Sequence, residues 1–330
     1  MLPTEYPFHQ VDVFTGEGYY GNPLAVVVAL DPALPIPGDE TMLRFAQWTN
    51  LSETTFLLPP SDPSKADYRV RIFTKAGELP FAGHPTLGTC KVFLLHTGRA
   101  VKAAMSTSRS SSSPPSDHLE IVQECSIGFV RIRVSSTGQG KEMISFIAPP
   151  LLRSGPVEEE KVMIACEAMG LDRSRDVMDT QWIVTGSPWF ALLVKDVETV
   201  MRAKRTPTAQ SRDLKFGIIG QYRRQESTVT APRGSEEQPL FEVRTFPHAG
   251  NVDEDPITGA FNAGMATWLI RSNLAPARYI VSQGTALGRC GRVLVERDDD
   301  DLSKPESRRD IWIGGEVVSC IEGTVRMPKE

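Results

Sequence analysis

The sequence carries one pattern twice, and this internal repeat restricts the possible folds more than any other feature. Arg71–Gly77 reads R-x-F-x-x-x-G and is followed by G-x-x-x-x-G at Gly83–Gly88. Both patterns recur at Arg244–Gly250 and Gly259–Gly264, with a longer gap between them. Each copy then runs into an apolar helical stretch. We therefore predict two homologous halves, each with a glycine-bearing loop at a helix N-terminus, and a site between the halves.

The composition is typical of a soluble globular protein. The 330 residues suffice for two domains, and 40% are hydrophobic while 23% are charged. The net charge of -5 offers no basic surface, so we expect no nucleic-acid partner. No run approaches the roughly 20 apolar residues of a membrane span, and the first residues do not resemble a secretory signal. We expect no membrane partner and a cytoplasmic location.

Cofactor and metal motifs are not found in the sequence. The five cysteines are scattered and form no C-x-x-C pair, which argues against a disulfide framework or a zinc site. The five histidines show no metal-ligand spacing. Because a Walker loop and a strand–GxGxxG–helix unit are also missing, we expect no metal, no ATP and no NAD.

Several elements can be predicted from composition and periodicity. β-branched residues around a Gly/Asn/Pro cluster predict a hairpin over residues 11–28, and core spacing predicts a helix over 40–49. Further strands are expected at Tyr68–Phe73, Leu119–Val122, Val130–Val134, Met143–Ile147, Trp182–Thr185 and Phe190–Val194.

Two helices are expected at the centres of their halves. One runs from His84–Pro85 to about His96 and stops at Gly98, which places His84 at or near the N-cap. The other, Pro256–Ile270, has no charged residue, as expected of a helix buried on all sides. The glycines inside these helices, Gly88 and Gly264, indicate close packing against surrounding strands.

The domain boundary is expected in the proline-containing segment Pro149–Pro156. This divides the chain into residues 1–148 and 149–317, and the last strand, near 318–330, is a candidate to return to the first half. The Ser-rich insert 106–116 is expected to be a disordered surface loop.

The glycine loops suggest carboxylate chemistry. Free N–H groups and the helix dipole favour an anion at a helix N-terminus. Removing a proton from a carbon then requires a base and stabilisation of the developing charge. The polar candidates at the loops are Glu78, His84, Asp253, Glu254, Asp255 and Thr258, and Glu53 is a further candidate outside them. From spacing alone, Glu53 could equally be an exposed turn residue, His84 a structural cap, and the acidic run a complement to a helix dipole.

These residues lie within stretches that resemble the phenazine-biosynthesis (PhzF-like) isomerase family, which shares the diaminopimelate epimerase fold. The matching stretches are V-D-V-F-T…G-N-P-L-A-V-V (11–27), N-L-S-E-T-T-F (50–56), R-I-F-T-K-A-G-E-L-P-F-A-G-H-P-T-L-G (71–88), D-E-D-P-I-T-G (253–259), Q-G-T-A-L-G-R (283–289) and I-G-G-E-V-V…E-G-T (313–324). They cover most of the chain apart from the Ser-rich insert and parts of 150–240.

The resemblance implies an α+β fold of two pseudo-symmetric domains, each a β-barrel-like sheet around a central buried helix. It also implies a cofactor-independent isomerase, expected to be a homodimer, that moves a proton between carbons of a small carboxylate-bearing substrate. Glu53 is then the general acid/base in the inter-domain cleft, supported by His84 and Asp255. Residues implied to bind the substrate are Gly83, Thr86, Thr258, Gly259 and Ala260.

The chain departs from the family pattern after D-P-x-T-G. Ala260 replaces the usual serine, and Phe261-Asn262 replace a small residue and a histidine. A hydroxyl donor is therefore missing, which leaves a second hypothesis open: a weakly active or inactive relative that binds a small acid or a protein partner. Racemisation by a pair of thiols is not expected, because the glycine loops contain no cysteine and Cys90 lies inside its helix.

Overall fold

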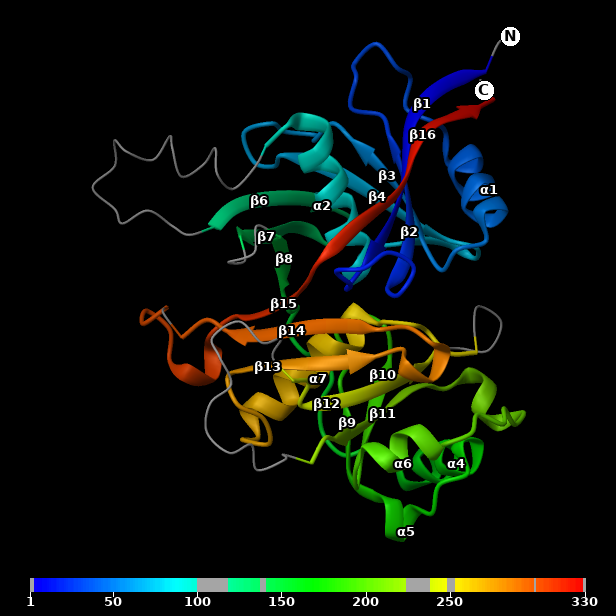
Figure 1. Ribbon diagram of the computed structural model, residues 1–330, viewed down its shortest axis with the longest axis vertical. Helices are drawn as coiled ribbons and strands as arrows, with labels where there is room; N and C mark the ends of the chain where they lie inside the picture. The colour runs from blue at the N-terminus through cyan, green and yellow to red at the C-terminus, as the bar shows by residue number, and fades with distance from the viewer. Residues whose placement is uncertain are drawn as a thin grey trace. The chain divides into compact units, whose positions relative to one another are not determined.

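The computed structural model describes residues 3–99, 118–136, 141–223, 238–247, 253–299 and 301–328. The chain forms two compact units, Met1–Ile147 together with Gly314–Glu330, and Ala148–Ile313 (Figure 1). The Ser-rich insert and the final glycine of the second R-x-F-x-x-x-G pattern, Gly250, lie outside the described residues. Among the helices that are described, none is long and apolar enough to cross a membrane.

The first unit is a mixed sheet around one helix. Its strands are β1 (Thr4–Val13), β2 (Asn22–Val28), β3 (Thr54–Leu58), β4 (Tyr68–Thr74), β5 (Gly77–Leu79), β6 (His118–Cys125), β7 (Gly128–Ser136), β8 (Glu142–Ile147) and β16 (Val317–Met327). They follow the order β16-β1-β2-β3-β4-β6-β7-β8, with β5 beside β4. The helices are α1 (Asp39–Thr49) and α2 (Gly83–Thr97). β16, the last strand of the chain, pairs antiparallel with β1 over its whole length.

The second unit repeats this plan. Its strands are β9 (Val177–Trp182), β10 (Trp189–Val194), β11 (Lys215–Gln221), β12 (Phe241–Phe246), β13 (Arg278–Gln283), β14 (Gly291–Arg297) and β15 (Ile311–Gly315). The order is β15-β14-β13-β12-β11-β10-β9. Its helices are α4 (Glu159–Met169), α5 (Arg173–Asp176), α6 (Val197–Arg202) and α7 (Gly259–Arg271).

The strand pairings show that the two units are equivalent. From β1 to β7 the successive pairs are antiparallel, parallel, antiparallel, parallel and antiparallel. From β9 to β14 the same alternation occurs in the same sequence. The central helices α2 and α7 follow equivalent strands, β4 and β12. The predicted α+β fold of two pseudo-symmetric domains is therefore confirmed.

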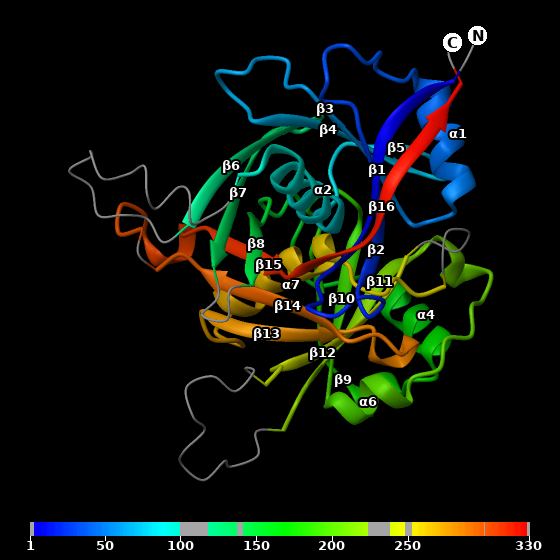
Figure 2. The same ribbon diagram turned by 45° about the horizontal axis from the view of Figure 1, so that its top comes forward.

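The two central helices are buried, as predicted. α2 contacts β1, β2, β3, β4, β6, β8 and β16, and Figure 2 shows it among these strands. In α7, every residue from Phe261 to Ile270 is buried. A Cβ on Gly88 would lie 2.6 Å from Leu24 Cδ2, and one on Gly264 would lie 2.6 Å from the carbonyl oxygen of Ile183. Gly88 thus allows α2 to approach its sheet closely, and Gly264 allows α7 to approach the connection that follows β9.

Some boundaries differ from the prediction. The strand expected at Trp182–Thr185 is wrong: β9 ends at Trp182, because its pairing with β10 places Trp182 opposite Phe190 and leaves residues 183–188 as the connection. α7 begins at Gly259 rather than Pro256. The helices α4 and α6 were missed between the repeats; α4 shows only a weak apolar face, with buried residues such as Val162 and Met169.

Candidate active site

The first unit brings two of the predicted catalytic residues together. Glu53 directly precedes β3, and His84 is the second residue of α2. His84 Nε2 lies 3.5 Å from Glu53 Oε2. The side chain of His84 is 5% exposed and that of Glu53 17% exposed, so the carboxylate retains access to a ligand while the imidazole does not. Glu53 is therefore not the exposed turn residue that spacing alone allowed.

The imidazole of His84 is neutral. Burial lowers its pKa from 6.5 to about 3, because the charged form loses its hydration. At neutral pH His84 therefore carries one ring proton and serves as a hydrogen-bonding group rather than a cation. The N-cap of α2 is Ala82, and no side chain caps this helix end, so His84 does not have the capping role that was considered.

The start of α2 offers backbone donors. The first backbone hydrogen bond of the helix runs from the N–H of Thr86 to the carbonyl of Ala82, at 3.2 Å. The N–H groups of Gly83 and His84 precede it and have no carbonyl acceptor in the helix, and Pro85 has no N–H. Such an end favours an anion.

The Thr86 hydroxyl forms its hydrogen bonds with other groups of the protein interior. Its hydroxyl donates to the Ala82 carbonyl at 2.9 Å and accepts from Gln123 Nε2 at 3.0 Å. Gln123 in turn accepts from the Tyr68 hydroxyl at 3.0 Å. These buried bonds fix the first turn of α2, so Thr86 supports the site chiefly by holding its backbone in place.

The second unit collects the other predicted site residues at the start of α7. Thr258, the N-cap, donates its hydroxyl to Asp255 Oδ2 at 2.6 Å, since an ionised carboxylate only accepts. Thr258 Oγ1 must then accept from Thr245 Oγ1, 2.6 Å away, and Thr245 accepts from Gln283 Nε2 at 2.9 Å. The hydrogen bonds therefore run in one direction, from Gln283 to Asp255.

Backbone donors also begin α7. The N–H of Asn262 donates to the Thr258 carbonyl at 3.0 Å, which leaves the N–H groups of Gly259, Ala260 and Phe261 without a helical acceptor. Ala260 is half-buried and brings no hydroxyl. Because the Thr258 hydroxyl donates to Asp255, this helix end presents backbone rather than side-chain donors to an anion.

Each unit contains an equivalent arginine–glutamate ion pair near its glycine loop, and the sequence analysis did not predict these pairs. Arg71 of β4 donates from Nε and Nη2 to Glu78 at 2.9 and 2.6 Å, and Arg244 of β12 binds Glu254 at 2.9 and 2.7 Å in the same bidentate way. Glu254 therefore pairs with Arg244 instead of complementing the dipole of α7. The signal was present in the sequence, because the arginine of each repeat is followed by a glutamate near the loop.

Each arginine also reaches an outer helix of its own unit. Arg71 Nη1 donates to Asp39, the first residue of α1, at 2.6 Å. Arg244 Nη1 donates to the carbonyls of Val200 in α6 and Ala203 just after it, at 3.1 and 2.6 Å. A repeated arginine clamp, Arg71–Glu78 and Arg244–Glu254, thus joins a strand, an outer helix and the loop before a central helix.

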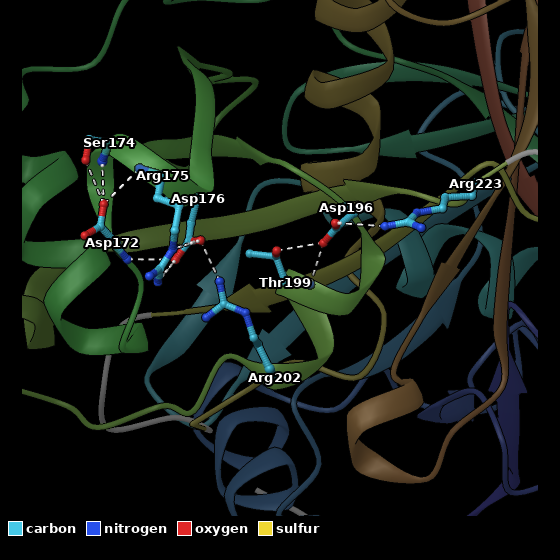
Figure 3. Close-up of polar contacts among 8 residues, drawn as sticks. All are labelled: Asp172, Ser174, Arg175, Asp176, Asp196, Thr199, Arg202 and Arg223. Carbon is cyan, nitrogen blue, oxygen red and sulfur yellow. Dashed lines mark hydrogen bonds and ion pairs between the residues drawn. The ribbon is translucent and has the colours of Figure 1, made fainter.

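A second polar cluster in the second unit is structural. Asp176 at the end of α5 is 2% exposed and binds Arg175 and Arg202, the latter at 2.6 Å (Figure 3). Hydrogen bonds from these arginines hold the pKa of Asp176 far below its usual range. Asp196 caps α6 by accepting from the N–H and hydroxyl of Thr199. These contacts connect α5 and α6 and lie on elements that contain none of the predicted site residues.

The described part of the chain shows neither a group of metal ligands nor a disulfide. Within those residues, no three His, Cys, Asp or Glu side chains are grouped so that they could hold a metal ion. All five cysteines are free thiols, and burial raises the pKa of Cys166 to about 11. Cys90, in the interior of α2, is likewise buried and has a raised pKa.

Comparison with known proteins connects this geometry to a family. The family model described as phenazine biosynthesis-like protein matches residues 11–323. Antisense-enhancing sequence 1 of Schizosaccharomyces pombe is 30% identical over 328 residues, which cover 97% of this chain and 98% of that protein. The trans-2,3-dihydro-3-hydroxyanthranilate isomerase of Pseudomonas aeruginosa is 48% identical over 79 residues, 24% of this chain and 26% of that enzyme.

A solved structure has the same fold. The PhzF-family phenazine biosynthesis protein of Bacillus anthracis superposes with a TM-score of 0.72 at 21% identity, over 98% of this chain and 99% of that one. The family match spans both units and all eight predicted site residues. The chain therefore belongs to the phenazine biosynthesis-like (PhzC/PhzF) family of isomerases and their relatives.

Proposed function

We propose that this isomerase moves a proton between two carbons of a small carboxylate-bearing metabolite without a cofactor, with Glu53 as the general acid/base. The observation that carries the proposal is the Glu53–His84 contact of 3.5 Å at the start of a buried helix. A partly accessible carboxylate beside a neutral, buried imidazole suits a group that must both take and return a proton.

The proton transfer requires no oxidant or reductant. The Glu53 carboxylate takes a proton from one carbon, and the electron pair of the broken C–H bond is delocalised within the substrate. The protonated Glu53 then delivers the proton to a second carbon, which restores the carboxylate. Stabilisation of the developing negative charge is assigned to backbone N–H groups, those of Gly83 and His84 in the first unit.

The second unit is proposed to contribute substrate contacts through the start of α7. Asp255 is oriented by Thr258, and Gly259 and Ala260 provide N–H groups for a carboxylate. The lack of a serine at Ala260 is expected to change the substrate preference relative to family members that have the hydroxyl. A dihydro-hydroxyanthranilate is the first compound to test, because an isomerase with that substrate in its name matches this chain locally.

The test follows deuterium uptake by proton NMR in D₂O. Wild-type protein and Glu53→Gln are incubated with trans-2,3-dihydro-3-hydroxyanthranilate and with a panel of cyclic and amino carboxylates. We expect isomerisation or solvent exchange with wild type and none with Glu53→Gln. Exchange that persists in Glu53→Gln would exclude Glu53 as the base. Thermal stabilisation by a carboxylate with no exchange from any compound would favour the binding-only alternative.

The assembly and location form part of the same proposal. We propose a cytoplasmic homodimer, as the resemblance to the family implies. Analytical ultracentrifugation is expected to give twice the chain mass of 36.4 kDa. A sedimenting species of the single-chain mass at micromolar concentration would contradict the dimer.

A further inference from the structure

The two ring nitrogens of His84 have different neighbours. Nδ1 lies 3.5 Å from Asn22 Nδ2, and Nε2 lies 3.5 Å from Glu53 Oε2. The Asn22 contact is at the long limit of a hydrogen bond, whereas the Nε2–Oε2 approach does not have hydrogen-bond geometry. Catalytic contacts in ligand-free sites are often long or poorly aligned and tighten when the substrate binds. His84 therefore lies between an amide on β2 and the carboxylate that precedes β3.

The chemistry of the neighbours determines where the ring proton lies. An amide nitrogen only donates, so the Nδ1 that faces it must be the unprotonated acceptor. A neutral imidazole then carries its single proton on Nε2, the ring nitrogen that lies 3.5 Å from Glu53 Oε2. The alternative tautomer would place two donors against each other at Nδ1 and leave a lone pair facing the carboxylate.

Asn22 is held firmly in this orientation. It is the first residue of β2, pairs with Val13 and is 1% exposed. The preceding residue, Gly21, donates its N–H to the buried Asp12 carboxylate at 2.9 Å. A Cβ on Gly21 would lie 2.3 Å from the Val13 carbonyl oxygen, so only glycine allows the loop to approach β1 this closely. Asn22 thus starts from a backbone that has little freedom to move.

We propose that Asn22 is a positioning residue that selects the Nε2–H tautomer of His84, so that His84 donates a neutral hydrogen bond to Glu53. A donor aimed at the charged form of a carboxylate stabilises that form. Asn22 thereby keeps Glu53 ready to accept a proton. The mechanistic consequence rests on the proposed function, whereas the tautomer itself does not.

The test is imidazole ¹⁵N NMR of the full chain without substrate, with the His84 signal assigned by His84→Gln. Wild type is expected to show a pyridine-type Nδ1 and a pyrrole-type Nε2 that do not titrate between about pH 5 and pH 8. A pyrrole-type Nδ1 in wild type would overturn the proposal, and this observation needs no variant to fold.

Two substitutions at position 22 test the cause. Asn22→Asp replaces the donor with an acceptor, so His84 should gain a proton at Nδ1, whereas Asn273→Asp, an exposed site in the second unit, should leave the His84 spectrum unchanged. Asn22→Ala removes the donor and should give a mixture of tautomers. An unaltered His84 spectrum in folded Asn22→Asp or Asn22→Ala would overturn the proposal.

A kinetic readout separates this inference from the proposed function. If the isomerase reaction is found, Asn22→Ala should lower kcat by about tenfold with little change in KM and move the acidic limb of the pH profile to higher pH. A uniform loss at every pH would indicate a merely structural role for Asn22. Lack of turnover in wild type, with the Nε2–H tautomer present, would contradict the proposed function and leave the tautomer assignment standing.

Discussion

At the scale of single residues, the candidate site contains a histidine whose burial keeps it neutral. His84 is buried, and this burial lowers its pKa to about 3. An unfolded chain exposes the same imidazole, which then titrates near 6.5. Because the unfolded state binds this proton more tightly, acid favours the unfolded state. The protonation of His84 therefore affects the stability of the protein as well as the candidate site.

This linkage gives a pH prediction. Between about pH 6.5 and pH 3 the unfolded state binds a proton at His84 that the folded state does not, so stability falls as the pH falls through that window and is constant above it. At pH 5 the loss from this one group is about 2 kcal/mol relative to pH 7. Urea unfolding of wild type and His84→Gln at the two pH values measures it. Equal pH dependence in the two proteins would contradict the assignment.

A second residue-scale prediction concerns Ala260. A serine here would add a hydroxyl beside the free N–H groups of α7 at a half-buried position. We expect Ala260→Ser to change turnover or carboxylate affinity, while the unfolding free energy changes by less than about 0.5 kcal/mol. Deuterium exchange and thermal unfolding with and without ligand measure the two effects. If neither activity nor affinity responds, position 260 is not in the site.

At the scale of elements, the arginine clamp occurs in both units but differs in burial. Arg244 and Glu254 are each 8% exposed, whereas Arg71 and Glu78 are 22% and 32% exposed. Removing one partner of a buried pair leaves an uncompensated charge, while a solvated pair contributes little. The same contact should therefore have different energetic weight in the two copies.

The two glutamates form a matched comparison. Glu254→Gln should lower the free energy of unfolding by about 3 kcal/mol, because Arg244 keeps its charge in a buried position. Glu78→Gln should cost about 1 kcal/mol or less, since Arg71 is more exposed and retains Asp39. Denaturant unfolding of both variants measures the difference. Equal losses would show that burial does not separate the two clamps.

At the scale of the whole molecule, strand β16 returns to the first unit, far along the chain from the other strands of that unit. β16 pairs with β1 from Val317 to Met327, and Met327 is buried beside Tyr6 and Val27. Without this strand, β1 would lose one hydrogen-bonded neighbour and the unit would lose part of its core.

Truncation after Glu316 should therefore act on one unit. We expect the amide protons of α2 to lose protection from hydrogen exchange, while those of α7 remain protected, because residues 317–330 belong to the first unit alone. Exchange followed by mass spectrometry on full-length and truncated protein measures this. Parallel loss of protection in both helices would contradict it.

The sequence by itself determined the fold class and the two helices at its centre. The repeat around Arg71 and Arg244 indicated two equivalent units, and the uncharged stretch before Arg271 indicated a buried helix. These features are local or periodic, so they can be read along the chain. The family motifs implied the α+β fold and the roles of Glu53 and His84, which were already among the polar candidates. The bounds of the short strand β9 and the helices α4 and α6 were not predicted, because their local sequence patterns are weak and tertiary packing determines them.

Only the tertiary structure decided how the candidate residues contact one another. Asn22, Glu53 and His84 are separated by tens of residues, and their contacts follow from the position of β2 and β3 beside the first turn of α2. The hydrogen bond from the Thr258 hydroxyl to Asp255 likewise depends on the fold around α7. Hydrogen bonds between distant segments require strand pairing and helix packing to be in place, and no spacing in the sequence encodes their direction.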